Sequence, residues 1–199
     1  VTLLEKNDRL GRKLFITGKG RCNITNSAEI EDMFSAVTSN PKFLYSGFYS
    51  FTNDQVIDFF EELGVKTKIE RGGRVFPESD HSSDVIRALE KEMNRLGVRV
   101  CLNTEVKELL LTEGRARGVH LSDGRTLEGD AVIVATGGIS SPSTGSTGDG
   151  YGFARHAGHK VTELSPSLVP MEVKEWYAKD LMGLSLRNIE ICITDGKKV

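Results

Sequence analysis

The chain begins with a short apolar run, residues 1–4, that ends abruptly at an acidic residue, Glu5. Such a run is typical of a buried parallel strand, which pairs with distant parts of the chain and is covered by helices. A carboxylate directly after it lies at the carboxyl edge of the sheet, where dinucleotide-binding folds use it to bind a ribose. The pattern favours an α/β domain, and an edge strand followed by a solvated loop is the simpler alternative.

The segment after Glu5 is rich in glycine, basic side chains and amides. Glycine lets the backbone approach a ligand closely, and arginine and lysine bind pyrophosphate oxygens. Asparagine amides both donate and accept hydrogen bonds. A nucleotide bound at Glu5 would meet suitable groups along this loop. The residues concerned are Gly11, Arg12, Lys13, Gly18, Lys19, Gly20, Arg21, Asn23 and Asn26.

A second apolar run, residues 130–134, leads directly into Ala135, Thr136, Gly137 and Gly138. It is predicted to be a second buried strand. Small residues at the carboxyl end of a parallel strand leave room for a ligand, and open α/β sheets bind ligands at that edge. A tight turn that needs glycine only for its positive φ is the alternative.

The polar, glycine-rich segment 140–150 precedes a predicted helix over residues 151–157, with Asp149 just before it. Free N–H groups at a helix N-terminus bind anions, so this loop is a candidate phosphate-binding element. A surface loop without a ligand is the alternative that the pattern leaves open.

The rest of the chain carries patterns of helices and antiparallel strands. Thr52 and Gln55 form a capping-box pattern at the start of a helix that ends at Gly64. Ser82 or Ser83 is predicted to cap a long amphipathic helix that runs to Leu96. The other predicted elements are two short helices within 29–50, separated at Asn40 and Pro41, a hairpin of 65–70 and 74–76, strands 98–102 and 160–162, and a meander of 105–112, 116–121 and 125–128.

Pro166 and Pro170 break the chain, and a domain boundary is predicted there. Beyond it, residues 183–187 and 190–194 alternate like strands of a second unit. A dinucleotide-binding unit normally begins with a strand, a glycine-rich turn and a helix before the strand that ends in the acidic residue. The sequence contains no GxGxxG, so we expect this chain to be a fragment without that first unit.

Composition limits the class of protein and its partners. The chain has 199 residues, of which 38% are hydrophobic and 27% charged, as in soluble globular proteins. Its net charge of -2 argues against a nucleic-acid partner, and its apolar runs are too short to span a membrane. Cys22, Cys101 and Cys192 form no CxxC pair, which favours a reduced, cytoplasmic protein.

Neither cysteine nor histidine forms a reactive pattern. Cys22 has no thiol partner within a few residues, so we interpret it as a packing residue. His156 and His159 are spaced i, i+3 near a predicted helix end, where interaction with the helix dipole explains them without a third metal ligand. We therefore predict no metal site.

Five segments together resemble a known family, the flavoproteins described as "aminoacetone oxidase family FAD-binding" or "NAD(P)/FAD-dependent oxidoreductase". The resemblance implies an α/β fold. A Rossmann-like FAD-binding domain of the two-dinucleotide-binding type would cover residues 1–166, and an inserted, mostly β, substrate-side domain would begin within 167–199. The segments are ITGKGRCNITN at 16–26, VATGG at 134–138, TGDGYGFARHAGH at 147–159, SLVPM at 167–171 and LMGLSLRNIEI at 181–191.

The resemblance also implies which residues contact FAD. Glu5 would hold the adenosine ribose, and the backbone of Val106 would meet the adenine. A loop after Glu5 would run past the pyrophosphate toward the flavin, and a turn at 136–138 would face the cofactor. The full implied set is Glu5, Lys6, Arg12, Lys13, Gly20, Arg21, Cys22, Asn23, Val106, Thr136, Gly137 and Gly138.

The activity implied by the resemblance is flavin-mediated oxidation or reduction of a small organic substrate. One alternative is a reductase that takes electrons from NAD(P)H and acts on an unsaturated or steroid-like substrate. The other is a nucleotide-binding module without catalysis. The pattern assigns no catalytic residue and fixes neither the substrate nor the oligomeric state.

Overall fold

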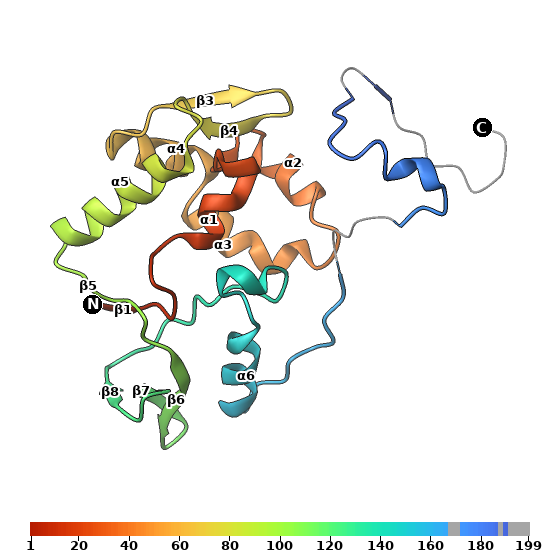
Figure 1. The fold of residues 1–199 in the computed structure, drawn as a ribbon. Helices are drawn as coiled ribbons and strands as arrows, with labels where there is room; N and C mark the ends of the chain where they lie inside the picture. The colour runs from red at the N-terminus through yellow and green to blue at the C-terminus, as the bar shows by residue number, and fades with distance from the viewer. Residues whose placement is uncertain (167–171, 187–188, 191–199) are drawn as a thin grey trace. The chain divides into compact units, whose positions relative to one another are not determined.

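The structure is a computed structural model that describes residues 1–166, 172–186 and 189–190. It divides into two compact units, Val1–Val161 and Thr162–Val199. In the first unit, the strand pair β1–β5 lies between a helical part that contains α1, α4 and α5 and an antiparallel meander (Figure 1).

The N-terminal strand pairs in parallel with a strand that follows it by almost half the chain. Strand β1 is Thr2–Leu4 and strand β5 is Arg99–Cys101, with Leu3 opposite Val100. The parallel strand predicted at the start of the chain is thus confirmed. Because the pair continues through a hydrogen bond from the Glu5 backbone N–H to the carbonyl of Cys101 (2.9 Å), Glu5 lies at its carboxyl end.

The helical part is organised around a small antiparallel sheet with the strand order β2-β4-β3. The hairpin predicted around Gly72 and Gly73, whose φ values are 79° and 72°, is confirmed. So is the capping box, in which Thr52 Oγ1 accepts from the N–H of Gln55 and the Gln55 side chain accepts from the N–H of Thr52. The elements are α1 (Arg12–Ile16), β2 (Thr25–Asn26), α4 (Asn53–Glu62), β3 (Thr67–Glu70), β4 (Arg74–Pro77) and α5 (Ser82–Arg95).

A small apolar core joins these elements. Cys22, Val65, Val85 and Ala88 are buried together, and partly buried side chains from α1 and α4 pack against them. Helix α1 packs directly on α5. The core fixes the loop after α1, which contains several of the predicted site residues.

The segment between β2 and α4 forms the two short helical pieces that the sequence predicted. Helix α2 is Ile30–Ser35, and helix α3, Tyr45–Ser50, follows the 3-10 helix η2, Pro41–Leu44. Aromatic rings hold them together, because Phe34 stacks on Phe48 with ring centroids 5.2 Å apart and contacts Tyr45 at 4.4 Å.

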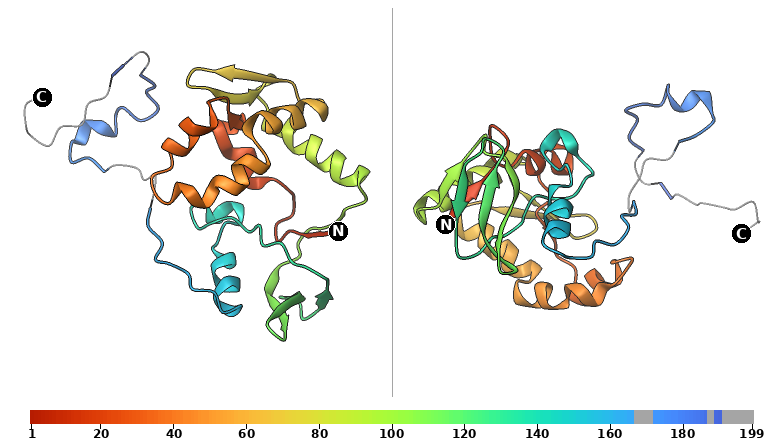
Figure 2. Two further views of the ribbon diagram at one scale, coloured as in Figure 1. Left: turned by 180° about the vertical axis from the view of Figure 1, so that it is seen from behind. Right: turned by 90° about the horizontal axis from the view of Figure 1, so that it is seen from below.

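The antiparallel meander is also confirmed. Its strands are β6 (Val106–Thr112), β7 (Arg115–Leu121) and β8 (Thr126–Glu128), paired in that order. Helix α6, Asp149–His156, packs beside β6 (Figure 2). A second apolar core forms there, and its buried members are Leu109, Val119, Leu121 and Phe153.

The strand predicted for residues 130–134 is wrong. The segment has no regular structure, and Ile133 is 91% exposed and Val134 45% exposed. A parallel strand gains its hydrogen bonds from neighbours, and no strand in the described part of the chain runs alongside this segment. The strand predicted at 160–162 is wrong for the same reason.

Two predicted element ends are also corrected. The N-cap of α5 is His81, without a side-chain hydrogen bond, whereas Ser82 is buried and donates its hydroxyl to the carbonyl of Phe15 (2.9 Å). The Ser82 hydroxyl thus bonds to the carbonyl of Phe15 and not to an N–H at the start of its own helix. Strand β4 extends to Pro77, which stands opposite Thr67, because pairing at that position does not need a proline N–H.

In the second unit, a strand was predicted for residues 183–187. Residues 184–186, which the structure describes, have irregular backbone and form no strand. Residues 187 and 191–194 lie outside the described residues. An alternating pattern needs a partner strand, and the described residues of this unit hold none. The inserted β domain therefore stays a prediction. The described helical element is the 3-10 helix η4, Trp176–Ala178.

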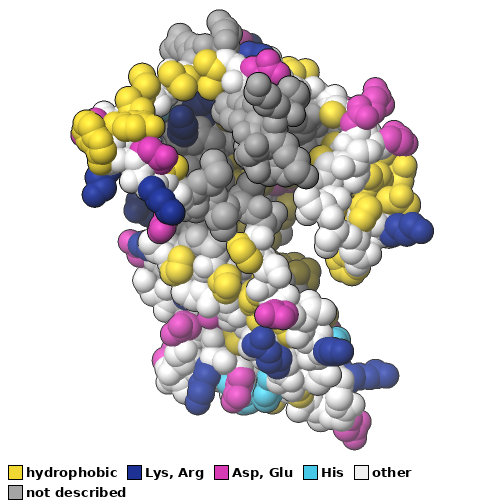
Figure 3. All heavy atoms as spheres, turned by 90° about the vertical axis from the view of Figure 1, so that its right-hand side faces the viewer, with side chains coloured by type: hydrophobic (Ala, Val, Ile, Leu, Met, Phe, Trp, Pro, Cys, Tyr) yellow, Lys and Arg dark blue, Asp and Glu magenta, His cyan; other side chains and the backbone are white. Residues whose placement is uncertain are grey.

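On the face seen in Figure 3, basic and acidic side chains of the described residues are interspersed. Among the described residues, no helix has the length and apolar character that a membrane crossing requires.

Candidate functional site

Glu5 is fixed at the end of β1 by its own backbone and side chain. Its carbonyl accepts from the N–H of Thr104 (2.9 Å), just before β6. Its side-chain Oε1 accepts from both the backbone N–H and the Nδ2 of Asn7, each at 2.8 Å. In the described part of the chain no hydrogen bond reaches Oε2, so one carboxylate oxygen is held in place and free to accept from a ligand.

Lys6 joins the loop after β1 to the start of helix α6. Its Nζ lies 2.6 Å from Asp149 Oδ2 and also donates to Thr147 Oγ1, which donates in turn to Asp149 Oδ1 (2.9 Å). Burial acts to raise the pKa of Asp149, but hydrogen bonds from Lys6 and Thr147 outweigh it and hold that pKa below its ordinary value. Asp149 is therefore ionised at neutral pH.

Two further contacts bring the segment 5–13 to the glycine-rich loop. Asn7 Nδ2 donates to the carbonyl of Thr144 (3.1 Å), and Lys13 Nζ donates to Ser141 Oγ (2.7 Å). A Cβ added at Gly145 would lie 2.6 Å from Asn7 Nδ2, so this approach requires glycine. Residues more than 120 positions apart thus form one edge of the unit.

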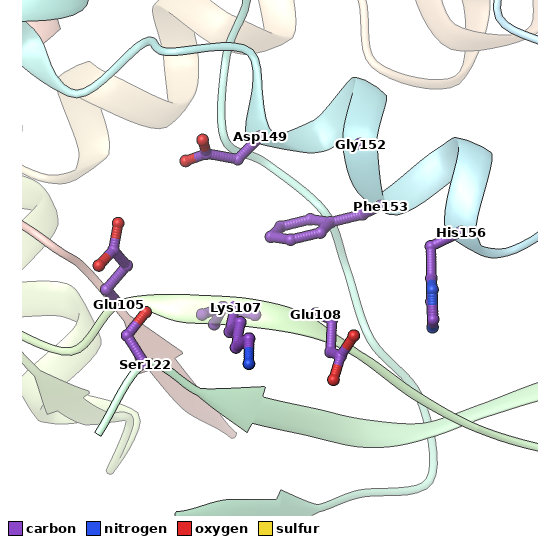
Figure 4. Close-up of a pocket in the computed structure, with 9 residues that line it drawn as sticks. Glu105, Lys107, Glu108, Ser122, Asp149, Gly152, Phe153 and His156 are labelled. Atoms are coloured by element: carbon purple, nitrogen blue, oxygen red, sulfur yellow. The ribbon is translucent and has the colours of Figure 1, made fainter. Parts of the chain in front are cut away.

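A hollow of about 470 Å³ opens beside this edge, between α6 and the start of β6. Figure 4 shows the Phe153 ring projecting from α6 into it, with Asp149 and Glu105 toward one end and His156 toward the other. Val106, the predicted adenine contact, is part of its wall. The lining residues are Glu105, Val106, Lys107, Glu108, Ser122, Asp149, Gly152, Phe153 and His156.

The turn at 136–138 packs against the glycine-rich loop of its own segment. The carbonyl of Gly138 accepts from the N–H of Gly148 (3.1 Å), and Gly137 has a φ of 72°. A Cβ at Gly150 would lie 2.7 Å from Thr136 Oγ1. The glycines here serve a close approach between two loop segments, and a contact of this turn with a cofactor stays a prediction.

Arg12 has a buried donor without a partner among the described residues. Its Nη2 donates to Asp8 Oδ1 (2.7 Å), but its Nε is buried and meets no partner among the described residues. A buried N–H without a partner is unfavourable, so a ligand oxygen at this position would satisfy it.

The residues 20–23 lie elsewhere, against the β3–β4 hairpin. Arg21 Nη1 lies 2.7 Å from Glu70 Oε1 and 3.4 Å from Asp80 Oδ1, and its guanidinium stands 4.1 Å from the centre of the Phe76 ring. The hydrogen bond with Glu70 raises the pKa of Arg21 further, so its charge is permanent and already matched by protein carboxylates. The structure does not bring Arg21 to Glu5.

The neighbours of Arg21 also face the protein. Cys22 is 1% exposed within the core of the helical part, where burial raises the pKa of its thiol, and this agrees with its interpretation as a packing residue. Asn23 Nδ2 donates to the carbonyls of Thr25 (2.8 Å) and Val75 (3.1 Å). A Cβ at Gly20 would meet nothing within 4 Å, so that position borders open space.

Sequence reasoning missed Asn7, Thr147 and Asp149 as members of this site. The sequence pattern places Asp149 only as the residue just before a predicted helix. The signal that points to it is its place in the TGDG segment at 147–150, where glycines flank an acidic residue at a helix start. In the described residues, no group of three or more histidine, cysteine or acidic side chains forms a metal-binding cluster.

A carboxylate at the carboxyl edge of a parallel strand pair, beside a glycine-rich loop that enters a helix, is the arrangement typical of dinucleotide-binding α/β proteins. The chain matches the model of the HI0933-like protein Rossmann domain over residues 1–196, and it belongs to that family. The flavoprotein family indicated by the sequence motifs is thereby confirmed, and membership implies FAD as the cofactor.

Curated relatives carry more specific names. The chain is 37% identical over 176 residues to the 3-dehydro-bile acid delta(4,6)-reductase of Clostridium scindens, covering 88% of this chain and 42% of that protein. It is 28% identical over 190 residues to the ribosomal RNA dihydrouridine synthase of Haemophilus influenzae, covering 94% and 47%. The Escherichia coli protein of the same name is also 28% identical, covering 93% and 45%. The chain thus spans less than half the length of these relatives.

Proposed function

We propose that this chain is the FAD-holding part of an oxidoreductase that reduces a carbon–carbon double bond. Two relatives of different name support a reduction, because both a delta(4,6)-reductase and a dihydrouridine synthase are named for the saturation of such a bond. The observation that carries the cofactor assignment is the fixed carboxylate of Glu5 at the edge of the β1–β5 pair, whose Oε2 accepts no hydrogen bond from the described residues.

The residues at this edge fit an adenine dinucleotide in chemistry and order. Glu5 would accept from the ribose hydroxyls, and the hollow beside Val106 would receive the adenine. Arg12, with its unpaired Nε, and Lys13 would bind pyrophosphate oxygens. FAD, when bound, supplies the hydride chemistry, and this chain binds and orients it.

We also propose that Lys6 and Asp149 keep the glycine-rich loop against the loop after β1 so that the dinucleotide meets both. Their short ion pair supports this role. Lys6 would thereby support dinucleotide binding in two ways, by holding the loop through Asp149 and by its own positive charge. NAD(P)H is the candidate electron donor.

The first experiment is a visible absorption spectrum and an FAD titration of the chain, repeated with the protein expressed from its whole reading frame. A flavin spectrum that NAD(P)H bleaches would support the proposal. Bleaching should reverse when an unsaturated steroid or a uridine-containing RNA is added, and whichever restores the colour identifies the substrate class. If neither protein takes up FAD, the oxidoreductase function is rejected.

A matched pair of variants tests the position of the cofactor. Glu5→Gln should weaken FAD binding on the order of tenfold or more, because a charge-assisted hydrogen bond to the ribose is lost. Glu62→Gln removes an exposed carboxylate at the end of α4 and should leave the affinity unchanged. Equal affinities in the two variants would contradict the ribose assignment while leaving FAD binding itself intact.

A further inference from the structure

The turn that follows helix α1 is strained. Gly18, Lys19, Gly20 and Cys22 have φ values of 56°, 60°, 85° and 62°. Lysine and cysteine rarely adopt the left-handed region, because their Cβ crowds the backbone there. Such a backbone persists only where surrounding contacts hold it. The question is which contacts hold this turn.

Arg21, near the end of the turn, is held by two carboxylates: Glu70 belongs to β3, and Asp80 follows β4. Two guanidinium nitrogens reach the two Glu70 oxygens, at 2.7 and 3.4 Å, and Asp80 lies 3.4 Å from Nη1. The guanidinium also stacks at 4.1 Å over Phe76, which is buried. A planar cation with two carboxylates and an aromatic face is held in both position and orientation.

The two carboxylates are themselves held by second cations. Lys68 Nζ pairs with Asp80 Oδ2, and Arg74 Nη2 lies 3.6 Å from Glu70 Oε2. The hydrogen bond from Lys68 is the main cause that keeps the pKa of Asp80 below its ordinary value. Asp80 is therefore ionised at neutral pH, and the cluster combines three basic with two acidic side chains, so its formal charges nearly balance.

Cys22, the residue after Arg21, is anchored by burial. The Cys22 N–H donates to the carbonyl of Thr17 (3.0 Å), which closes the turn, and the Cys22 side chain is 1% exposed beside Val65 and Val85. Because Arg21 and Cys22 are adjacent, release of Arg21 removes one of the two anchors. Cys22 is therefore a built-in reporter of whether the turn is closed.

We propose that Glu70 and Asp80 are positioning residues that clasp Arg21 and so keep the strained turn 17–22 closed on the core. The clasp consists of Arg21, Glu70, Phe76 and Asp80. It assigns Arg21 to the hairpin and not to pyrophosphate. The consequence for the cofactor rests on the proposed function, in which this chain holds FAD.

The test measures alkylation of Cys22 by iodoacetamide in the 199-residue chain, read at the peptide level by mass spectrometry, with Cys101 as internal reference. Glu70→Gln should speed Cys22 labelling relative to Cys101 on the order of tenfold, because a charge-assisted bond that holds the turn is lost. Glu92→Gln is the matched control, since Glu92 accepts two bonds from Arg95 on the surface of α5. It should leave the ratio unchanged.

Several outcomes separate the possibilities. Faster labelling of both cysteines in Glu70→Gln would indicate general unfolding and would overturn the clasp for that variant. The deciding variant is then Asp80→Asn, because asparagine tolerates the positive φ of 57° at that position. If the labelling rate of Cys22 relative to Cys101 is unchanged in both Glu70→Gln and Asp80→Asn, the proposal is overturned. The reading needs no cofactor, so it stands whether or not FAD binds.

A second readout concerns the flavin. In protein that binds FAD, Glu70→Gln should shift the flavin absorption band, whereas Glu92→Gln should not. If Glu70 has only a structural role, Glu70→Gln would lower thermal stability and leave the band where it is. Wild-type protein without any flavin uptake would reject the proposed function but would leave the clasp to be judged by Cys22 alone.

Discussion

The meander and the segment directly after it, residues 130–134, are both apolar, yet only the meander forms a core. Leu109, Val119 and Leu121 are buried, because antiparallel strands joined by short turns supply one another with hydrogen bonds and apolar contacts. Ile133 is exposed, because a parallel strand needs partners from distant parts of the chain. Apolar sequence becomes buried structure only where the topology brings a partner.

The largest expected effect comes from a substitution in the meander core. Phe153 is the contribution of α6 to the meander core and is 8% exposed. Phe153→Ala should lower the free energy of unfolding by about 3–5 kcal/mol, since a cavity replaces a ring against β6 and β7. Denaturant melts measure it, and Phe153→Leu, which keeps most of the volume, should lose clearly less. Equal losses would mean that the ring is not packed as described.

An intermediate effect is expected where the charged contact of Lys6 and Asp149 ties α6 to β1. The folded pKa of Asp149 is lowered, so its stabilisation is present above the unfolded pKa and is lost as pH falls through the folded value. Asp149→Asn should cost about 1 kcal/mol at neutral pH, reduced by partial solvent exposure. The difference from wild type should shrink below about pH 4.

The Lys6–Asp149 contact has a direct control. If the two side chains act through each other, Lys6→Gln and the double variant should resemble Asp149→Asn in urea melts, and the losses should not add. Additive losses would show that the helix start and the loop after β1 are stabilised independently.

The smallest effect is expected in the exposed segment 130–134. Ile133→Ser in the 199-residue chain should change the free energy of unfolding by less than about 0.5 kcal/mol, because the side chain is 91% exposed. In protein expressed from the whole reading frame, the same change should cost more if the segment gains a partner strand there. A large loss already in the chain itself would contradict the exposure described for Ile133.

Features that depend on neighbouring residues could be predicted from the sequence. The capping box of Thr52 and Gln55 spans three positions, and the hairpin at Gly72 and Gly73 requires only a turn with positive φ. The meander followed in the same way from its two short turns. The fold class was predictable as well, because an apolar run ending in Glu5 is a local pattern.

Features that depend on distant residues could not be predicted. Lys6 meets Asp149 across 143 positions, and Arg21 meets Glu70 across 49. Local pattern assigned Arg21 to an anion but could not say that the anion is a carboxylate of the hairpin. Ser82 likewise suits a cap by its type, but its hydroxyl bonds to Phe15 across 67 positions.

The burial of Cys22 has a consequence for work with the protein in air. Reduced flavin that meets oxygen yields peroxide, and peroxide attacks the thiolate form of cysteine. Peroxide in the solvent does not reach Cys22, because its side chain is buried. Its raised pKa also keeps it in the thiol form. We expect it to stay unmodified when peroxide is present, so a gain of oxygen mass at Cys22 would be an early sign that the surrounding core has opened.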